Sequence, residues 1–311
     1  MSLTEIRPVH LPELRHDLVQ HMASERGLNQ LGRFEGNRLT TGESVIGAIT
    51  SEDLRADEIA RLSGAALFYV SPEMTELTKA ASGSLPYFDL NREDLPAEQG
   101  LIVFAEPVGA YSNDGKPDAK VRACCWEVME HGALWLTFYT DWHEWLEDCR
   151  EAGIFRPDSL DDCLRNDHWL YFETFVFSPL KGHREVEGEW EEDAREVGTL
   201  DRAVRAAWLL MQQPLAETSD VLPDRAARRR LQRAGQQPST VRVIGLRRPK
   251  GSSEKGDGSR DYHHQWIVRG HWRQQWYPSR QVHRPVWIAP HVKGPEGAPM
   301  IGGEKVYAWK K

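Results

Sequence analysis

The chain has 311 residues, of which 40% are hydrophobic and 28% charged, and its formal net charge is −8. This composition excludes collagen-like, coiled-coil and wholly disordered proteins, and the length is enough for two domains of about 100–200 residues each. No run approaches the roughly 18 apolar residues of a membrane span, and the N-terminus lacks the pattern of a secretory signal. Because four cysteines are also too few for a disulfide framework, we expect a cytoplasmic protein with no membrane partner.

The first 198 residues predict helices alternating with short strands, which is typical of an α+β or α/β layered domain. A loop rich in Gly, Asn and Thr is expected over 27–42, and the acidic stretch 181–198 is expected to be a solvated loop or frayed helix. The helices are predicted over 12–22, 51–64, from 71 onward and over 141–150, and the strands over 65–70, 100–105, 121–129, 132–140 and 169–177.

The remaining sequence predicts a connector followed by a small β module. Residues 199–213 and 224–235 have helical patterns, the second rich in arginine. Strands are expected over 240–248, 262–272, 286–291 and 305–309, which would form a β-meander or barrel-like module. The predicted division is therefore an acidic mixed domain over 1–198, a helical connector over 199–237 and a basic β module over 238–311.

Charge is distributed very unevenly along the chain. Residues 1–220 carry 20 Lys and Arg against 41 Asp and Glu, a net charge of −21, whereas residues 221–311 carry 19 against 6, a net charge of +13. The basic part also holds five of the twelve tryptophans and five of the twelve histidines. This asymmetry indicates either separate partners for the two parts or one part masking the other.

The segment 262–278 (YHHQWIVRGHWRQQWYP) is the best candidate for a binding surface. If it is a strand, alternation places Trp266, Val268 and Trp272 on one face and polar side chains on the other. Those polar side chains are Gln265, Arg269, His271 and Arg273. Guanidinium groups suit bidentate phosphate contacts and the nearby aromatic rings suit base stacking, so the pattern favours DNA or RNA as a partner.

The predicted nucleic-acid contacts lie in the module and in the arginine-rich helix. The alternatives are that the tryptophans fill a core while the charges solubilise it, that the module binds a protein or another anion, or that the helix docks on the chain's own acidic part. The predicted contacts are Arg228, Arg229 and Arg230 of the helix and Arg269, His271, Arg273, Arg284 and Lys293 of the module.

A metal-independent ribonuclease, toxin-like, is the alternative function that the same residues allow. Histidine suits both proton-transfer roles near pH 7, and arginine suits a developing phosphorane charge. The candidates are His271 with His264, His283 or His291 as acid and base, and Arg269 or Arg273 as the cation. A protein-interaction module without a nucleic-acid role is the third hypothesis, and the sequence leaves open which of the three applies.

The other apparent motifs do not predict a metal site or a cofactor. The cysteines lack zinc-site spacing, and Cys124 and Cys125 are expected in a core strand. The carboxylates over 141–151 are expected mainly as a solvated helix face. No Gly-rich phosphate loop or Gly-x-Ser-x-Gly elbow is present, and the sequence predicts no oligomeric state.

Three stretches carry a family resemblance. They are Ala66–Ala105, Arg202–Pro214 (RAVRAAWLLMQQP) and the tail Val268–Pro295 (VRGHWRQQWYPSRQVHRPVWIAPHVKGP), which is the most specific. Together they resemble an uncharacterised group of bacterial and phage-associated proteins. The resemblance implies a cytoplasmic protein linked to mobile elements, and it implies no activity and no site residue.

Overall fold

A computed structural model describes residues 5–38, 50–88, 90–112, 115–129, 133–154, 170–179, 191–247 and 266–293. Its centre is one mixed β-sheet with strand order β6-β5-β4-β2-β1-β8-β7, and β3 pairs with β4 beside this path. The strands are β1 (Ala66–Val70), β2 (Gln99–Phe104), β3 (Gly109–Tyr111), β4 (Ala119–Val128), β5 (Ala133–Asp141), β6 (Leu170–Pro179), β7 (Ala216–Val221) and β8 (Val241–Leu246).

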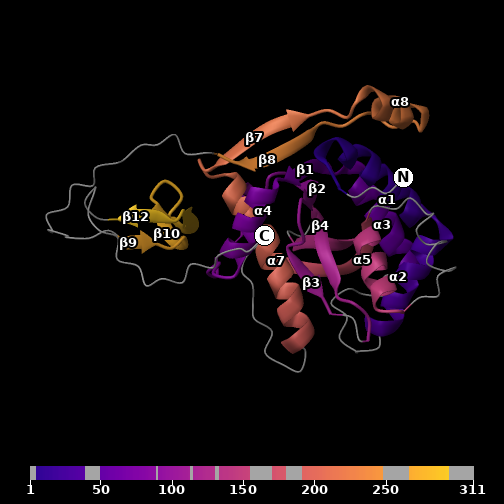
Figure 1. Cartoon of the computed structure of the whole chain (residues 1–311), viewed down its shortest axis with the longest axis horizontal. Coiled ribbons are helices and arrows are strands. Elements are labelled where there is room, and N and C mark those ends of the chain that lie inside the picture. The colour runs from indigo at the N-terminus through magenta and orange to yellow at the C-terminus, as the bar shows by residue number, and fades with distance from the viewer. Residues whose placement is uncertain are drawn as a thin grey trace, which may run out of the picture.

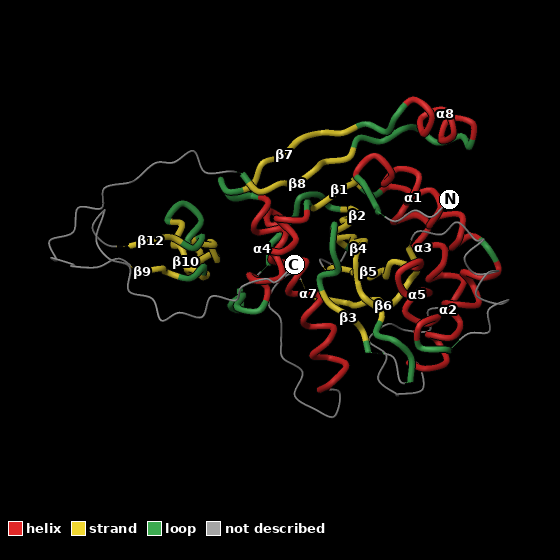
Figure 2. The backbone as a smooth tube through the Cα atoms, viewed as in Figure 1, coloured by secondary structure: helices red, strands yellow, loops and turns green. Residues whose placement is uncertain are grey.

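Helices cover both faces of this sheet (Figures 1 and 2). The helices α1, α2 and α3 contribute to the core on one face, and α4 and α7 contribute to the core on the other. The bounds are α1 (Leu11–Ala23), α2 (Glu25–Arg38), α3 (Ser51–Gly64), α4 (Pro72–Ser82), α5 (Trp142–Glu151), α7 (Glu191–Met211) and α8 (Arg225–Arg233), with short 3-10 turns at Pro8–His10 and Arg92–Asp94.

The central strands are apolar throughout because both of their faces are buried. In β1, Leu67 and Tyr69 point to the side of α1 and α3, while Phe68 and Val70 point to the side of α4 and α7. A β-carbon at Gly100 of β2 would lie 2.4 Å from the Trp126 ring. Glycine at this position therefore makes room for the indole.

Local signals placed several helix starts correctly. The Ser71 hydroxyl accepts a hydrogen bond from the Met74 amide at the start of α4, and Asp141 caps α5 in the same way. At α3, however, the cap is Thr50 rather than Ser51, because its hydroxyl accepts from the Asp53 amide. The predicted helices, the predicted strands up to residue 140 and the α+β class are confirmed within the described residues.

The prediction of a loop over 27–42 is wrong for residues 27–38, which are helical in α2. Leu31 of this helix is buried in the core, and a Gln30 side-chain oxygen lies 3.0 Å from the His21 ring. Tertiary contacts with α1 thus outweigh the low helix propensity of the glycines. The acidic stretch 181–198 was predicted as a solvated loop or frayed helix, and its last residues, from Glu191 onward, are helical in α7.

The C-terminal third does not form the predicted meander, and the sheets contain no closed barrel among the described residues. Strand β8, expected in the module, instead pairs in parallel with β1 at the centre of the main sheet. Because α7, β7 and β8 belong to this layered unit, the predicted division at 198 and at 238 does not follow its layers. The predicted strand 305–309 lies outside the described residues.

The described part of the predicted module consists of two small antiparallel strand pairs, β10 (His271–Tyr277) with β11 (Val282–Ile288) and β9 (Trp266–Val268) with β12 (His291–Lys293). Figure 1 shows it at one end of the molecule, next to α4 and α7. The predicted strands 262–272 and 286–291 are thus present but differently bounded.

Candidate nucleic-acid interface

The four short strands are two halves of one bent ribbon, which we define as residues 266–293. His271 faces Ile288 in the β10–β11 pair, and Val268 faces His291 in the β9–β12 pair. Both pairs therefore have the same register. Between the two pairs, residues 269–270 on one side of the hairpin and 289–290 on the other do not form strand hydrogen bonds. The ribbon is a single hairpin with one interruption.

The interruption has a local cause. A β-carbon at Gly270 would lie 2.5 Å from the Trp287 ring and 3.1 Å from Pro290, so only glycine allows this approach. Pro290 also lacks an amide proton for the ladder. The histidine after each gap has its Nδ1 atom 3.0 Å from a freed carbonyl oxygen, His271 at Arg269 and His291 at Ala289. With the proton on Nδ1, each imidazole donates a hydrogen bond to this carbonyl oxygen and so stabilises the bend.

Tryptophans fix the ribbon to the helical face of the main domain. Trp287 is 6% exposed and belongs to the core that α7 lines, and it packs edge-on against Trp272 at 5.3 Å between ring centroids. The Trp272 indole donates a 2.8 Å hydrogen bond to the Ala81 carbonyl, and the Trp287 amide donates a 3.1 Å bond to Gln213. These two indoles are therefore part of the core and unavailable to a ligand.

Two arginines of the ribbon are neutralised by the domain's own carboxylates. Arg284 pairs with the buried carboxylate of Asp94, and its side chain is 14% exposed. Arg280 in the hairpin turn forms a 2.6 Å ion pair with Glu93. The prediction that Arg284 contacts nucleic acid is thus corrected, because breaking this pair would leave a buried charge unpaired.

The solvent-facing side of β10 keeps much of the predicted character. Alternation places His271, Arg273, Gln275 and Tyr277 on one side, opposite Trp272. Arg273 is exposed, and its guanidinium donates a 2.8 Å hydrogen bond to the Gln275 side chain. Arg269 at the bend, and Lys293 with His291 on β12, carry no ion pair within that part of the chain. Gln265 is outside it.

Aromatic side chains gather around this end of the ribbon. The exposed aromatic residues among those that the structure describes are Tyr87 (64% exposed), Trp276 (43%) and Tyr277 (37%). Trp276 and Tyr277 belong to β10, and the Gln274 amide lies 3.5 Å from the Tyr87 carbonyl oxygen. Sequence reasoning missed Tyr87, which follows α4 and has no local signal that links it to the ribbon.

His271 and His283, one of the histidine pairs proposed for ribonuclease chemistry, are not brought together. His283 faces Trp276, with ring centroids 4.8 Å apart, whereas His271 faces Ile288 five rows away on the other side of the ribbon. At about 3.4 Å per residue, five rows separate them by about 17 Å, too far to serve one phosphate. His264 lies outside the described residues.

The arginine-rich helix α8 is elsewhere, at the tip of an arm formed by β7 and β8. Arg230, one of its predicted contacts, forms a two-pronged ion pair with Glu13 of α1, whereas Arg228 and Arg229 are exposed. Figure 1 shows the ribbon and α8 at opposite ends of the molecule. One short ligand therefore cannot contact both groups of predicted residues.

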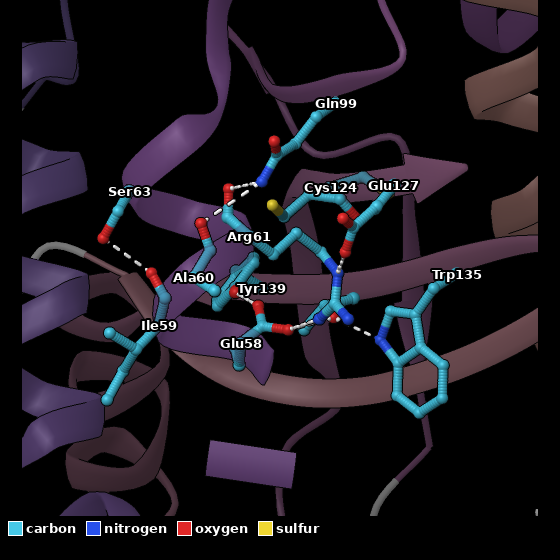
Figure 3. A network of polar contacts seen from close by, with 12 residues as sticks. Glu58, Ile59, Ala60, Arg61, Ser63, Gln99, Cys124, Glu127, Trp135 and Tyr139 are labelled. Atoms are coloured by element: carbon cyan, nitrogen blue, oxygen red, sulfur yellow. Dashed lines mark hydrogen bonds and ion pairs between the residues drawn. The ribbon is translucent and has the colours of Figure 1, made fainter. Parts of the chain in front are cut away.

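A buried polar network between α3 and β5 was not predicted. The Glu58 carboxylate accepts hydrogen bonds from the Thr137 hydroxyl at 2.8 Å and from the Tyr139 hydroxyl, and it pairs with Arg61 (Figure 3). Glu58, Arg61, Thr137 and Tyr139 are each no more than 4% exposed. Because the groups satisfy one another away from solvent, we assign this network to stability rather than to ligand binding.

This network predicts that the protein loses stability in alkali. Burial and the Glu58 charge raise the pKa of Tyr139 well above its usual range, and burial raises that of Cys125. Above about pH 8.5 the unfolded chain releases thiol and phenol protons that the folded chain keeps, so the free energy of unfolding falls as pH rises. We expect urea midpoints measured between pH 8 and 10.5 to fall less steeply in Tyr139→Phe. If the urea midpoint of Tyr139→Phe falls with pH as steeply as that of the wild type, the assigned role of Tyr139 is contradicted.

The carboxylates of α5 have cations of the chain itself as partners. Lys120 pairs with Glu144 at 3.1 Å and with Asp148 at 2.9 Å, and Arg122 pairs with Glu144 at 3.1 Å. Asp141 accepts backbone hydrogen bonds as the cap of α5. Cys124 and Cys125 are fully buried free thiols in β4, as predicted.

Among the described residues, no helix combines the length and apolarity that crossing a bilayer requires. The chain matches no protein-family model. It also matches no curated protein and no solved structure at a significant level, so its function has to be inferred from the geometry above.

Proposed function

We propose that this chain binds nucleic acid with unpaired bases through the exposed side chains of the ribbon. The observation that carries the proposal is that the exposed Tyr277 lies on the same side of β10 as Arg273, which forms no ion pair within the described residues, while the exposed Trp276 lies next to Tyr277 on the opposite side and Tyr87 lies near Gln274. Stacking of a base on an aromatic ring contributes about 1–3 kcal/mol and requires bases that are free of a duplex. Arginine adds phosphate contacts and cation–π contacts to such a site.

The proposal keeps Arg269, His271, Arg273 and Lys293 from the predicted contacts and replaces Arg284 by Trp276 and Tyr277. It requires no cofactor and places the activity in the cytoplasm, where the buried thiols stay reduced. The link to mobile elements stays a prediction from the family resemblance.

We expect fluorescence anisotropy with a labelled 12-nucleotide single strand to show binding that weakens as salt increases. Arg273→Gln should weaken this binding about three- to ten-fold and lower the salt slope by about one, because it removes one phosphate contact. Trp276→Ala should weaken it by about ten-fold, since a stacking contribution of about 1.4 kcal/mol corresponds to that factor.

The matched control is Arg55→Gln on α3, where a partly exposed arginine pairs with Glu52 at 2.5 Å. It changes the net charge by the same amount, so equal weakening by Arg55→Gln and Arg273→Gln would overturn the assigned surface. Lack of binding at low salt would favour the protein-interaction hypothesis instead. When the labelled strand is RNA, cleavage that persists in the double variant His271→Ala, His283→Ala would show chemistry that the ribbon does not explain.

A further inference from the structure

Helix α8 is held rigidly in one orientation. Its cap, Asp224, accepts a 2.8 Å hydrogen bond from the Ala227 amide, and Ala227 and Leu231 are buried against the domain. Arg230 donates two hydrogen bonds to the Glu13 carboxylate of α1, from Nε to Oε1 at 2.5 Å and from Nη2 to Oε2 at 2.9 Å. After the helix, the Ser239 hydroxyl accepts a 2.8 Å hydrogen bond from the Arg15 guanidinium of α1. The same guanidinium donates a 2.7 Å hydrogen bond to the Ala65 carbonyl. The segment that carries the helix is therefore tied to the domain at both of its ends.

This anchoring leaves one helix face covered with arginines. At about 100° per residue, Arg225, Arg229 and Arg233 form a row that points directly away from the buried Ala227 and Leu231. Arg228 lies at the edge of the same face. All four arginines are exposed, and none forms an ion pair within the described part of the chain.

The row is electrostatically unfavourable in the free protein. Successive members are four residues, or about 6 Å, apart along the axis, and like charges at this spacing repel one another. Glu13, a carboxylate of α1 beside the helix, is already engaged by Arg230. A regular array of anions alongside the helix would convert this repulsion into attraction.

The surroundings of α8 differ from those of the ribbon in one decisive respect. The exposed aromatic residues of the described chain are all at the ribbon, and the large exposed apolar side chain nearest to α8 in sequence is Leu222. A surface with guanidinium groups and no aromatic ring has charge for phosphates but nothing on which unpaired bases stack. It therefore has no reason to prefer single strands over duplexes.

We propose that the row Arg225, Arg229 and Arg233, with Arg228 at its edge, is a second nucleic-acid site that binds the phosphate backbone of a duplex. This site is independent of the ribbon, because the two lie at opposite ends of the molecule (Figure 1). Together they would let one chain hold a duplex segment at one end and an unpaired segment at the other.

The test uses the full chain and a labelled blunt-ended duplex of 16 base pairs without overhangs. The variant Arg225→Gln, Arg229→Gln, Arg233→Gln should lose at least ten-fold in duplex affinity at 100 mM salt, with a salt slope lower by about three. It should keep its affinity for a short single strand. Thermal unfolding should be unchanged or slightly improved, since the substitutions relieve repulsion at exposed positions.

The matched control removes three arginines that already have carboxylate partners, the exposed Arg92 and Arg150 and the partly exposed Arg55, in Arg55→Gln, Arg92→Gln, Arg150→Gln. Equal loss of duplex binding in this control would overturn the proposal, as would undiminished duplex binding in the α8 variant. Competition by polyglutamate as strong as that by unlabelled duplex would also overturn it, in favour of an acidic protein surface.

The ribbon proposal fails by a different result. Trp276→Ala should leave duplex binding intact while it weakens single-strand binding. Undiminished single-strand binding in Trp276→Ala would contradict the ribbon assignment alone, and loss of duplex binding in Trp276→Ala would contradict the independence of the two sites.

Discussion

Replacing Arg61 by alanine is expected to lower the free energy of unfolding by about 3–5 kcal/mol. Arg61 is 2% exposed and pairs with the buried carboxylate of Glu58, and its Nε lies 3.3 Å from a Glu127 oxygen. Its guanidinium also sits 5.1 Å from the centre of the Trp135 ring. The substitution leaves the Glu58 charge buried without its cation, which costs far more than the loss of an exposed ion pair.

The measurement is urea-induced unfolding of wild type and variant, followed by circular dichroism. Arg55→Ala is the control on the same helix, because Arg55 also pairs with a glutamate three residues away but its side chain is 27% exposed, and its effect should stay below about 1 kcal/mol. In a double variant, Glu58→Gln with Arg61→Met, much of the loss should be recovered, since no unpaired charge remains. Equal effects of Arg61→Ala and Arg55→Ala would contradict the proposed role of the network.

This network also shows what local sequence patterns can and cannot provide. The pattern over 51–64 predicts the helix correctly, but Glu58 and Arg61 look like ordinary solvent-facing charges there. They are buried because Tyr139 of β5, 81 residues away in sequence, supplies a hydroxyl at the carboxylate. A partner at such a distance leaves no trace in helical periodicity, so the helix could be predicted and its burial could not.

The strands show the same separation between local and long-range information. Apolar β-branched runs predicted β1 and β2 well, because a strand buried on both faces has a distinctive composition. The pattern also predicted a strand where β8 lies, but its pairing with β1 joins residues about 175 positions apart. Proximity in sequence to the basic segment suggested a module, whereas the hydrogen-bond partners put β8 in the main sheet.

For the candidate interface, residue types were informative and pairings were not. Period-two alternation predicted that Arg273 and His271 are exposed opposite Trp272, and this is confirmed. Arg284 was predicted as a nucleic-acid contact from the basic character of its segment, and it is held by Asp94, 190 residues earlier. Opposite charges in one chain can find each other after folding, and net charge by segment does not reveal which of them do.

Replacing Trp287 by alanine is expected to detach the ribbon from the domain. Removing a buried tryptophan costs about 3–5 kcal/mol, and here the lost contacts are those with Trp272 and with the core beside α7. An isolated two-stranded hairpin is at best marginally stable in water. Undocking should therefore also unfold the ribbon, whereas the main sheet keeps its own core.

Hydrogen exchange measured by mass spectrometry distinguishes these levels. Amides of β10 and β11 should lose protection by about a hundred-fold or more in Trp287→Ala, since each 1.4 kcal/mol corresponds to a factor of ten, while amides of β2 and β4 change little. Equal loss of protection in β2 and β10 would show that ribbon and sheet unfold as one unit, against this prediction.

The control is Trp276→Ala on the partner strand β10, which removes a tryptophan that is 43% exposed and should leave β10 and β11 protected. Comparison of the two variants then distinguishes loss of the folded ribbon from loss of a binding contact. Both should lose single-strand binding, Trp287→Ala because the surface is no longer formed and Trp276→Ala because a stacking ring is missing from an intact surface. Single-strand binding that survives Trp287→Ala with an unprotected ribbon would move the binding site away from residues 266–293.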